Sequence, residues 1–213
     1  MNSNFTYIHS APQDLEDNKK YPALFLMHGM GSNENDLVGL VSSFNEKCHI
    51  FSIRGPISQP PGYAFFTIEG LGKPHRAVFD QVVGDLQSLI EELSNNYSID
   101  TNQLFLLGFS QGAILTQSLA LVMGDKIKGI IALSGYIPAF VKEEYEHQSV
   151  NNLNAFISHG EFDNMLPYEW GTASRDYFVE KGAKVTFKSY PVAHGVAPGN
   201  QRDLVTFLDE QIS

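Results

Sequence analysis

The sequence predicts an α/β protein with a doubly wound, mostly parallel sheet, and two observations support this prediction. Short apolar runs, typical of strands buried on both faces, alternate along the chain with longer segments of helical periodicity. Strands and helices that alternate in this way form a parallel sheet covered by helices. In addition, the candidate functional segments come directly after predicted strands, where sheets of this kind bind ligands.

Length and composition predict one domain, residues 1–213, in an ordinary globular protein. The chain is 43% hydrophobic and 18% charged, and it is long enough to bury a substantial core. A net charge of −10 without clustered Lys or Arg argues against nucleic acid and anionic membranes as partners. The single cysteine, Cys48, is expected to be buried and inert. The first residues lack a leader pattern and no long apolar run exists, so we expect a cytoplasmic protein without stable membrane insertion.

The first quarter of the chain shows three apolar runs separated by polar turns. These runs predict strands at residues 5–9, 21–27 and 49–53. The second strand ends at a glycine-rich segment, and the polar residues after it lead into a short helix at residues 34–44.

Residues 54–74 contain four prolines and four glycines, which is too broken a pattern for a regular element. Because this stretch also contains Tyr63, Phe65 and Phe66, we expect an ordered loop with an apolar face. A long amphipathic helix follows, since apolar residues recur at helical spacing from Phe79 to Leu93.

The remaining chain continues the alternation of strand and helix. Apolar runs predict strands at residues 104–107, 127–133, 155–159 and 184–190. Helices are expected at residues 113–123, 168–181 and 202–212. Residues 134–154 are expected to be irregular, with one short helix.

The strand at residues 104–107 runs into a Gly-x-Ser-x-Gly motif, Gly108 to Gly112. The motif alone is weak, but it lies between a predicted strand and a predicted helix, the context that supports it. Glycines allow the backbone to turn sharply there, and the turn lifts the Ser110 hydroxyl to the top of the sheet. Ser110 is therefore the candidate nucleophile; the alternative is a structural turn with an incidental serine.

A serine hydroxyl needs a general base, and the base needs a group that holds its tautomer. With this motif the chain order is serine, acid, histidine. His194 follows the last predicted strand and satisfies that order, so it is the expected base. For the acid, the loop after residues 155–159 offers Asp163 first and Glu161 second. Asp176 falls in a predicted helix, where a solvent-exposed position is the simpler interpretation.

The oxyanion of an acyl-transfer reaction needs two backbone donors. The amide of Gln111, directly after the nucleophile, is one candidate. The other is expected from the segment His28-Gly29-Met30-Gly31, where glycines allow close approach to a substrate, and Met30 is the expected donor.

The combined motifs resemble the phospholipase/carboxylesterase family of small serine esterases, which includes acyl-protein thioesterases. The similarity extends from about Tyr21 to the C-terminus. It rests on these segments: Leu26–Gly31, Arg54–Pro56, Gly62–Phe66, Gly108–Gly112, Leu133–Pro138, His159–Gly160 with Asp163 and Pro167, and Tyr190 with His194–Gly195. The resemblance implies an α/β-hydrolase fold, and the irregular stretches at residues 54–74 and 134–154 are too short for a separate cap domain. The resemblance also implies Ser110, Asp163 and His194 as the triad, with the Met30 and Gln111 amides as the oxyanion hole.

Two departures from the family pattern concern the neighbourhood of the expected site. Ala113 stands where a second glycine commonly follows the motif, and residues 191–193 read Pro-Val-Ala where the family usually has glycines. The asparagine-rich loop at residues 33–36 is more similar to bacterial carboxylesterases than to depalmitoylating members.

These observations predict a serine carboxylesterase that hydrolyses short- to medium-chain esters through an acyl-enzyme. The alternatives are an acyl thioesterase or lysophospholipase with the same residues and, more remotely, a non-catalytic binding module. A small-molecule ester is the expected partner; no cofactor and no metal are expected. The family is sometimes dimeric, so monomer and homodimer both stay open. The expected acyl-pocket residues are Phe65, Phe66, Ile137 and Leu166.

Overall fold

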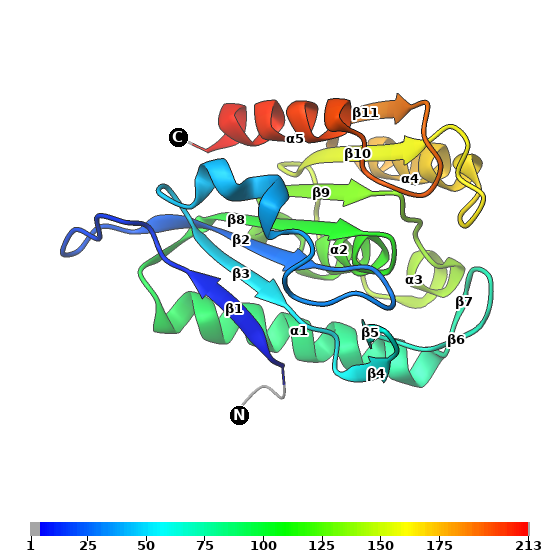
Figure 1. Ribbon diagram of the computed structural model, residues 1–213, viewed down its shortest axis with the longest axis horizontal. Coiled ribbons are helices and arrows are strands. Elements are labelled where there is room, and N and C mark those ends of the chain that lie inside the picture. Colours follow the sequence, from blue (N-terminus) through cyan, green and yellow to red (C-terminus); the bar gives the residue numbers. More distant parts are fainter. Residues whose placement is uncertain (1–4, 213) are drawn as a thin grey trace.

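A seven-stranded sheet forms the centre of the computed structural model, which describes residues 5–212 (Figure 1). Its strands are β1 (Tyr7–Ser10), β2 (Tyr21–Met27), β3 (His49–Ile53), β8 (Ile99–Phe109), β9 (Gly129–Leu133), β10 (Asn154–Gly160) and β11 (Lys184–Tyr190). Their order across the sheet is β1-β3-β2-β8-β9-β10-β11. Only the edge strand β1 is antiparallel to its neighbour among these pairs, so the expected mostly parallel α/β fold is confirmed.

Helices cover both faces of this sheet (Figure 1). The helical segments are η1 (Val38–Phe44), α1 (Arg76–Asn96), α2 (Gln111–Met123), η2 (Gly124–Lys126), α3 (Ala139–Glu144), α4 (Tyr168–Glu180) and α5 (Pro198–Gln211). Apolar residues of α1, α2 and α4 pack on one face, and those of η1 and α5 pack on the other.

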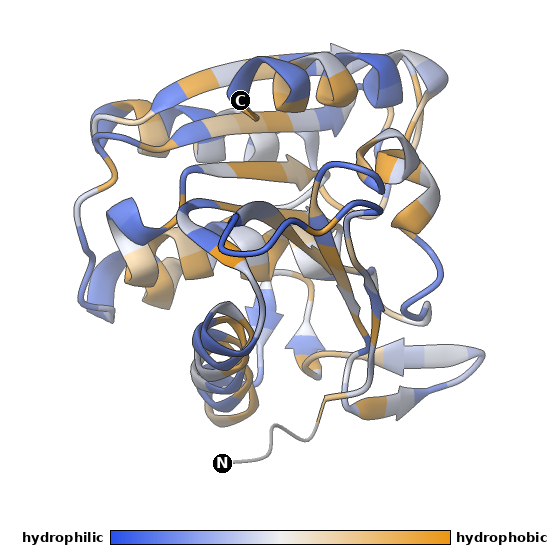
Figure 2. Ribbon diagram, turned by 90° about the vertical axis from the view of Figure 1, so that its left-hand side faces the viewer, coloured by the Kyte–Doolittle hydropathy of each residue, from blue (hydrophilic) through white to orange (hydrophobic). Residues whose placement is uncertain are grey.

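Strand β2 contributes side chains to the apolar clusters on both faces of the sheet. Side chains alternate across a strand, and here Phe25 and Met27 join the cluster under α1 and α2, whereas Leu24 and Leu26 face η1 and α5. All four are fully buried, so truncation of any one to alanine is expected to cost about 2–5 kcal/mol. Figure 2 shows the central strands coloured mostly as hydrophobic, while the helices around them carry both colours.

Residues 54–74 correct one expectation, because they contain two small hairpins instead of an irregular loop. The strands are β4 (Ile57–Gln59) with β5 (Gly62–Ala64), and β6 (Ile68–Gly70) with β7 (Lys73–Pro74). The prolines and glycines that argued against regular structure occupy the turns: Pro60 and Pro61 connect β4 to β5, and Gly72, with φ of 74°, lies between β6 and β7.

Several element boundaries also differ from expectation. The helix expected at residues 34–44 is a 3₁₀ helix that starts at Val38, and β8 starts at Ile99 and not at residue 104. Helix α5 begins at Pro198, since a proline fits the first helical turn, where its missing N–H costs nothing. Cys48 is buried as expected, and burial raises the pKa of its thiol to about 12.

The parallel strands end at one edge of the sheet, on the right in Figure 1. The loops that follow β2, β8, β10 and β11 therefore meet there, and these are the loops that contain Met30, Ser110, Asp163 and His194. Between residues 5 and 212, no helix is long and apolar enough to span a membrane.

Candidate active site

Ser110 occupies a strained turn between β8 and α2. Its φ of 53° and ψ of −114° lie in a region that non-glycine residues rarely adopt. The Ser110 amide donates to the Leu133 carbonyl at 2.9 Å, which holds the turn against β9. A Cβ on Gly108 would lie 2.2 Å from the Gly112 backbone, and one on Gly112 would lie 1.8 Å from the Met27 oxygen. Both glycines of the motif are therefore required by close backbone approach.

A hydrogen-bonded chain links Ser110 to the loops after β11 and β10. His194 Nε2 lies 2.8 Å from Ser110 Oγ, and His194 Nδ1 lies 2.7 Å from Asp163 Oδ2. Phe109 supports the imidazole, with ring centroids 4.9 Å apart. The structure thus brings together the three side chains that the sequence suggested. Glu161 instead accepts a hydrogen bond from Ser189 and is exposed, and Asp176 pairs with Arg175 on the surface.

The Asp163 carboxylate is buried and held by several donors. Its Oδ1 accepts hydrogen bonds from the amides of Met165 and Leu166, both at 2.9 Å. Burial alone would raise the pKa of Asp163, but His194 and these two amides outweigh it and lower the pKa below its usual value. The carboxylate is therefore charged at neutral pH, with its second oxygen directed at the His194 ring.

His28 and the β4–β5 hairpin hold the loop after β2 in place. His28 Nε2 accepts from the Gly55 amide at 3.0 Å, so Nδ1 bears the proton and donates to the Gly29 carbonyl at 2.7 Å. Gly31 donates to the Tyr63 carbonyl at 2.8 Å. Within residues 5–212, the amide of Met30 has no acceptor, and neither does the amide of Gln111. Both are therefore free to donate to a ligand at Ser110.

The side chain of Gln111 has a structural contact that the motif did not reveal. Its Oε1 accepts from the Phe65 amide at 2.6 Å, and its Nε2 donates to the Phe66 carbonyl at 2.7 Å. This residue therefore joins the start of α2 to the segment between the two hairpins.

A pocket of about 280 Å³ opens beside Ser110. Phe66 and Leu166, two of the four acyl-pocket candidates, line it, together with Ile114, Tyr136 and four exposed apolar side chains. Those four are Met30, Ile68, Leu71 and Met165. Two expectations need correction: Phe65 is fully buried against His28 and does not line this pocket, and Ile137 lines a neighbouring one. The two rings have different neighbours in the bend after β5: Phe65 lies against His28, with ring centroids 4.9 Å apart, and Phe66 packs edge to face on Phe79, also at 4.9 Å.

Comparison with known proteins assigns the chain to a family. Residues 14–212 match the model of the phospholipase/carboxylesterase family. The chain belongs to this family. Acyl-protein thioesterase 1 of Debaryomyces hansenii is 30% identical over 168 residues, which cover 73% of this chain and 71% of that protein. Acyl-protein thioesterase 1 of Candida albicans is 26% identical over 208 residues, covering 87% and 90%.

Two solved structures have the same fold as this chain. The Bacillus cereus carboxylesterase superposes with a TM-score of 0.87 at 20% identity and covers 98% of this chain and 95% of its own. A carboxylesterase from Mesorhizobium loti gives a TM-score of 0.83 at 20% identity, covering 97% and 95%. The α/β fold and the esterase family are thereby established, and the chain is a hydrolase of the carboxylesterase and acyl-protein thioesterase family.

Sequence reasoning about this family member missed three supporting side chains: His28, Gln111 beyond its amide, and His159. Each of these residues lies in a motif that the sequence had already marked. Their side chains, however, form hydrogen bonds with backbone atoms of other segments of the chain. Their positions inside these motifs were the only indication in the sequence that they matter. The sequence does not reveal their hydrogen-bond partners.

Proposed function

We propose that this protein is a serine carboxylesterase that hydrolyses short- to medium-chain carboxylic esters through an acyl-enzyme. The observation that supports it best is the continuous chain Ser110 Oγ, His194, Asp163, with separations of 2.8 and 2.7 Å. In such an arrangement the histidine can take the proton of the serine hydroxyl as the serine attacks a carbonyl. The histidine can then deliver that proton to the leaving alcohol.

In the proposed reaction, Ser110 Oγ bonds to the ester carbonyl carbon while His194 Nε2 takes the hydroxyl proton. The imidazolium then protonates the leaving alcohol as the carbon–oxygen bond of the ester breaks. Water, deprotonated by the same imidazole, attacks the acyl-enzyme; the imidazolium then returns the proton to Ser110 Oγ as the acyl–oxygen bond breaks and the acid leaves. The charged Asp163 stabilises the imidazolium in both halves and holds Nδ1 protonated.

The free amides of Met30 and Gln111 are the proposed oxyanion donors. Both line the pocket beside Ser110, and Gln111 is the first residue of α2, where helix N–H groups are available to a developing anion. Losing one such donor typically costs a factor of about 10²–10³ in kcat.

The proposed chain-length range follows from the pocket. Its volume of about 280 Å³ is near the lower end of small-molecule sites, and its lining is mostly apolar. An uncharged short or medium acyl chain suits such a space. The named relatives keep acyl thioesters as a second candidate, because the same residues can cleave either bond.

Two measurements test the proposal. A fluorophosphonate probe should label wild-type protein at Ser110, and Ser110→Ala should abolish both labelling and turnover of p-nitrophenyl esters. The ratio of kcat/KM for p-nitrophenyl butyrate and for butyryl-CoA then separates esterase from thioesterase. Undiminished labelling of Ser110→Ala would exclude Ser110 as the nucleophile.

A further inference from the structure

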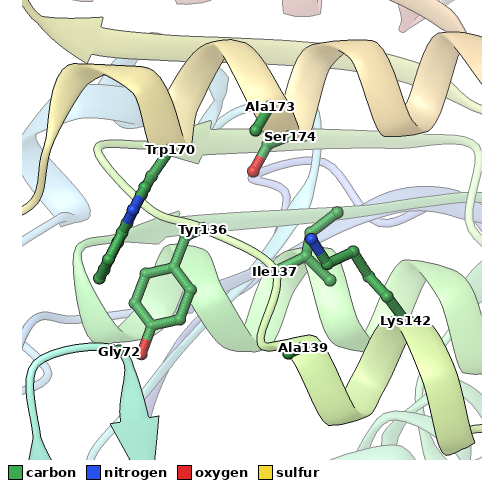
Figure 3. A pocket seen from close by; sticks show the side chains of 8 residues that line it. All are labelled: Gly72, Tyr136, Ile137, Ala139, Lys142, Trp170, Ala173 and Ser174. Atoms are coloured by element: carbon green, nitrogen blue, oxygen red, sulfur yellow. The ribbon is translucent and has the colours of Figure 1, made fainter.

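A second pocket, of about 210 Å³, lies between α3 and α4 next to the one at Ser110 (Figure 3). Gly72 and Tyr136 line both pockets, so the two spaces adjoin. The second pocket is distinct because it reaches residues of α3 and α4 that do not line the first. These are Ala139, Lys142, Trp170, Ala173 and Ser174.

Trp170 and Tyr136 form an aromatic wall of this pocket. Their rings meet edge to face with centroids 4.6 Å apart, which fixes both orientations. The β6–β7 turn rests on the same indole, since a Cβ on Gly72 would lie 2.7 Å from Trp170 Cη2. The wall is therefore preformed and can pack against an apolar part of a ligand.

Ser174 presents a buried hydroxyl without a partner. Serines in helix interiors commonly bond the carbonyl four residues earlier, as Ser94 and Ser118 do here. Ser174 is only 2% exposed, yet its Oγ has no hydrogen-bond partner within the described residues. In Figure 3 this oxygen points away from α4 toward the pocket. A buried hydroxyl left unpaired costs about 1–3 kcal/mol, a cost that a ligand acceptor could relieve.

Lys142 contributes a positive charge that no carboxylate neutralises. Lys19, Lys47 and Lys126 each pair with an acidic side chain, but Lys142 forms no ion pair within residues 5–212. Figure 3 shows its side chain extending from α3 with the nitrogen directed over Ile137 toward the pocket. The described lining residues include no Asp or Glu that would repel an anion.

We propose that this pocket is a subsite for a carboxylate carried by the substrate at a distance from the ester bond. The apolar wall would hold the intervening carbon chain, Lys142 would pair with the carboxylate, and the Ser174 hydroxyl would donate to it. This inference rests on the proposed esterase function and narrows the substrate class to esters with a remote carboxylate.

The chain offers a direct binding signal and a matched control. Trp170 is the single tryptophan, so intrinsic fluorescence reports on this pocket. Lys181 lies over the Tyr177 ring at 5.4 Å, much as Lys142 does at 5.9 Å, but it does not line the pocket. Lys181→Gln therefore removes an equivalent charge from a similar environment.

In the binding experiment, hexanoate is titrated into the protein at fixed ionic strength, with hexan-1-ol as the uncharged probe. Saturable change of Trp170 fluorescence is expected with hexanoate in wild type, Ser110→Ala and Lys181→Gln. Lys142→Gln should weaken hexanoate binding roughly five- to tenfold and leave hexan-1-ol unaffected, as expected for one charge-assisted contact. Equal hexanoate affinity in Lys142→Gln and wild type would overturn the subsite.

The kinetic experiment compares mono-p-nitrophenyl esters of glutarate, adipate and suberate with uncharged p-nitrophenyl esters of matching chain length. It also compares hexanoate esters of alcohols with and without a terminal carboxylate. In Lys142→Gln, kcat/KM should fall roughly five- to tenfold for at least one of the two sets of carboxylate-bearing esters. For the uncharged esters, kcat/KM should stay the same. Hydrolysis of uncharged esters with no Lys142 effect would refute the subsite alone. No hydrolysis of any ester, with Lys142-dependent hexanoate binding, would instead refute the proposed function.

Discussion

The ring of His159 lies against the carboxylate of Asp163, with Nε2 3.4 Å from Oδ2. The same nitrogen donates to the Leu166 carbonyl at 3.0 Å, and Leu166 in turn donates its amide to Asp163. Burial lowers the pKa of His159, so the ring is neutral with its proton on Nε2. His159 therefore holds both the carboxylate and the loop that supplies its amide donors.

His159→Leu is expected to lower kcat about tenfold, because the Asp163 loop loses its buried donor and the Leu166 carbonyl is left unpaired. His159→Gln keeps a side-chain N–H and should recover part of that loss. Steady-state kinetics of both variants, with circular dichroism to verify folding, make the test. Equal loss in the two variants would indicate that packing of the ring matters and its hydrogen bond does not.

Asp163→Asn should retain the fold yet lower kcat by about 10⁴, since the His194 tautomer and imidazolium lose their carboxylate. Glu161→Gln is the matched control from the same loop; Glu161 contacts Ser189 and should change kcat by less than about twofold. The comparison needs only kcat at one pH. If Glu161→Gln were the more damaging change, the acid would have to be reassigned.

Gln111→Ala keeps the backbone donor but removes the two bonds that fix the Phe65–Phe66 segment, of which Phe66 lines the pocket. We expect kcat/KM to fall roughly tenfold, less than the 10²–10³ typical of a lost oxyanion donor. Gln117→Ala is the control, because Gln117 is also buried in α2 but bonds only within the helix. A Gln111→Ala variant as inactive as Ser110→Ala would assign the side chain a more direct part.

Protein stability should fall in mildly acidic solution because of His49. Burial, reinforced by nearby His9, lowers the pKa of His49 to about 4. In the unfolded chain the His49 ring becomes protonated near pH 6.5, whereas in the folded chain it stays neutral until the pH approaches about 4. The stabilisation is therefore complete above about pH 6.5 and is lost as the pH falls toward about 4, by about 3 kcal/mol at most.

Urea unfolding of wild type and His49→Gln between pH 7.5 and 4.5 tests this prediction. The free energy of unfolding should decline less steeply with acidification in the variant. Parallel curves for the two proteins would show that other groups account for the acid sensitivity.

The sequence by itself determined most of the fold. Strands β2, β3 and β11 have the bounds that their apolar or alternating runs predict, since burial on a sheet requires those residue types in succession. The order of serine, acid and histidine, each after a predicted strand, also indicated which three side chains meet, because parallel strands end at one edge.

Only the tertiary structure decided how that edge is built. The bonds from Gln111 to the Phe65–Phe66 backbone and from His159 to the Leu166 carbonyl join segments through main-chain atoms, which every residue possesses and no sequence pattern marks. The hairpins at residues 57–74 depend on turns whose prolines and glycines equally suit an irregular loop. The pocket lined by Lys142 and Ser174 exists because the fold brings residues of α3 and α4 to the same space, and neither helix alone determines that arrangement.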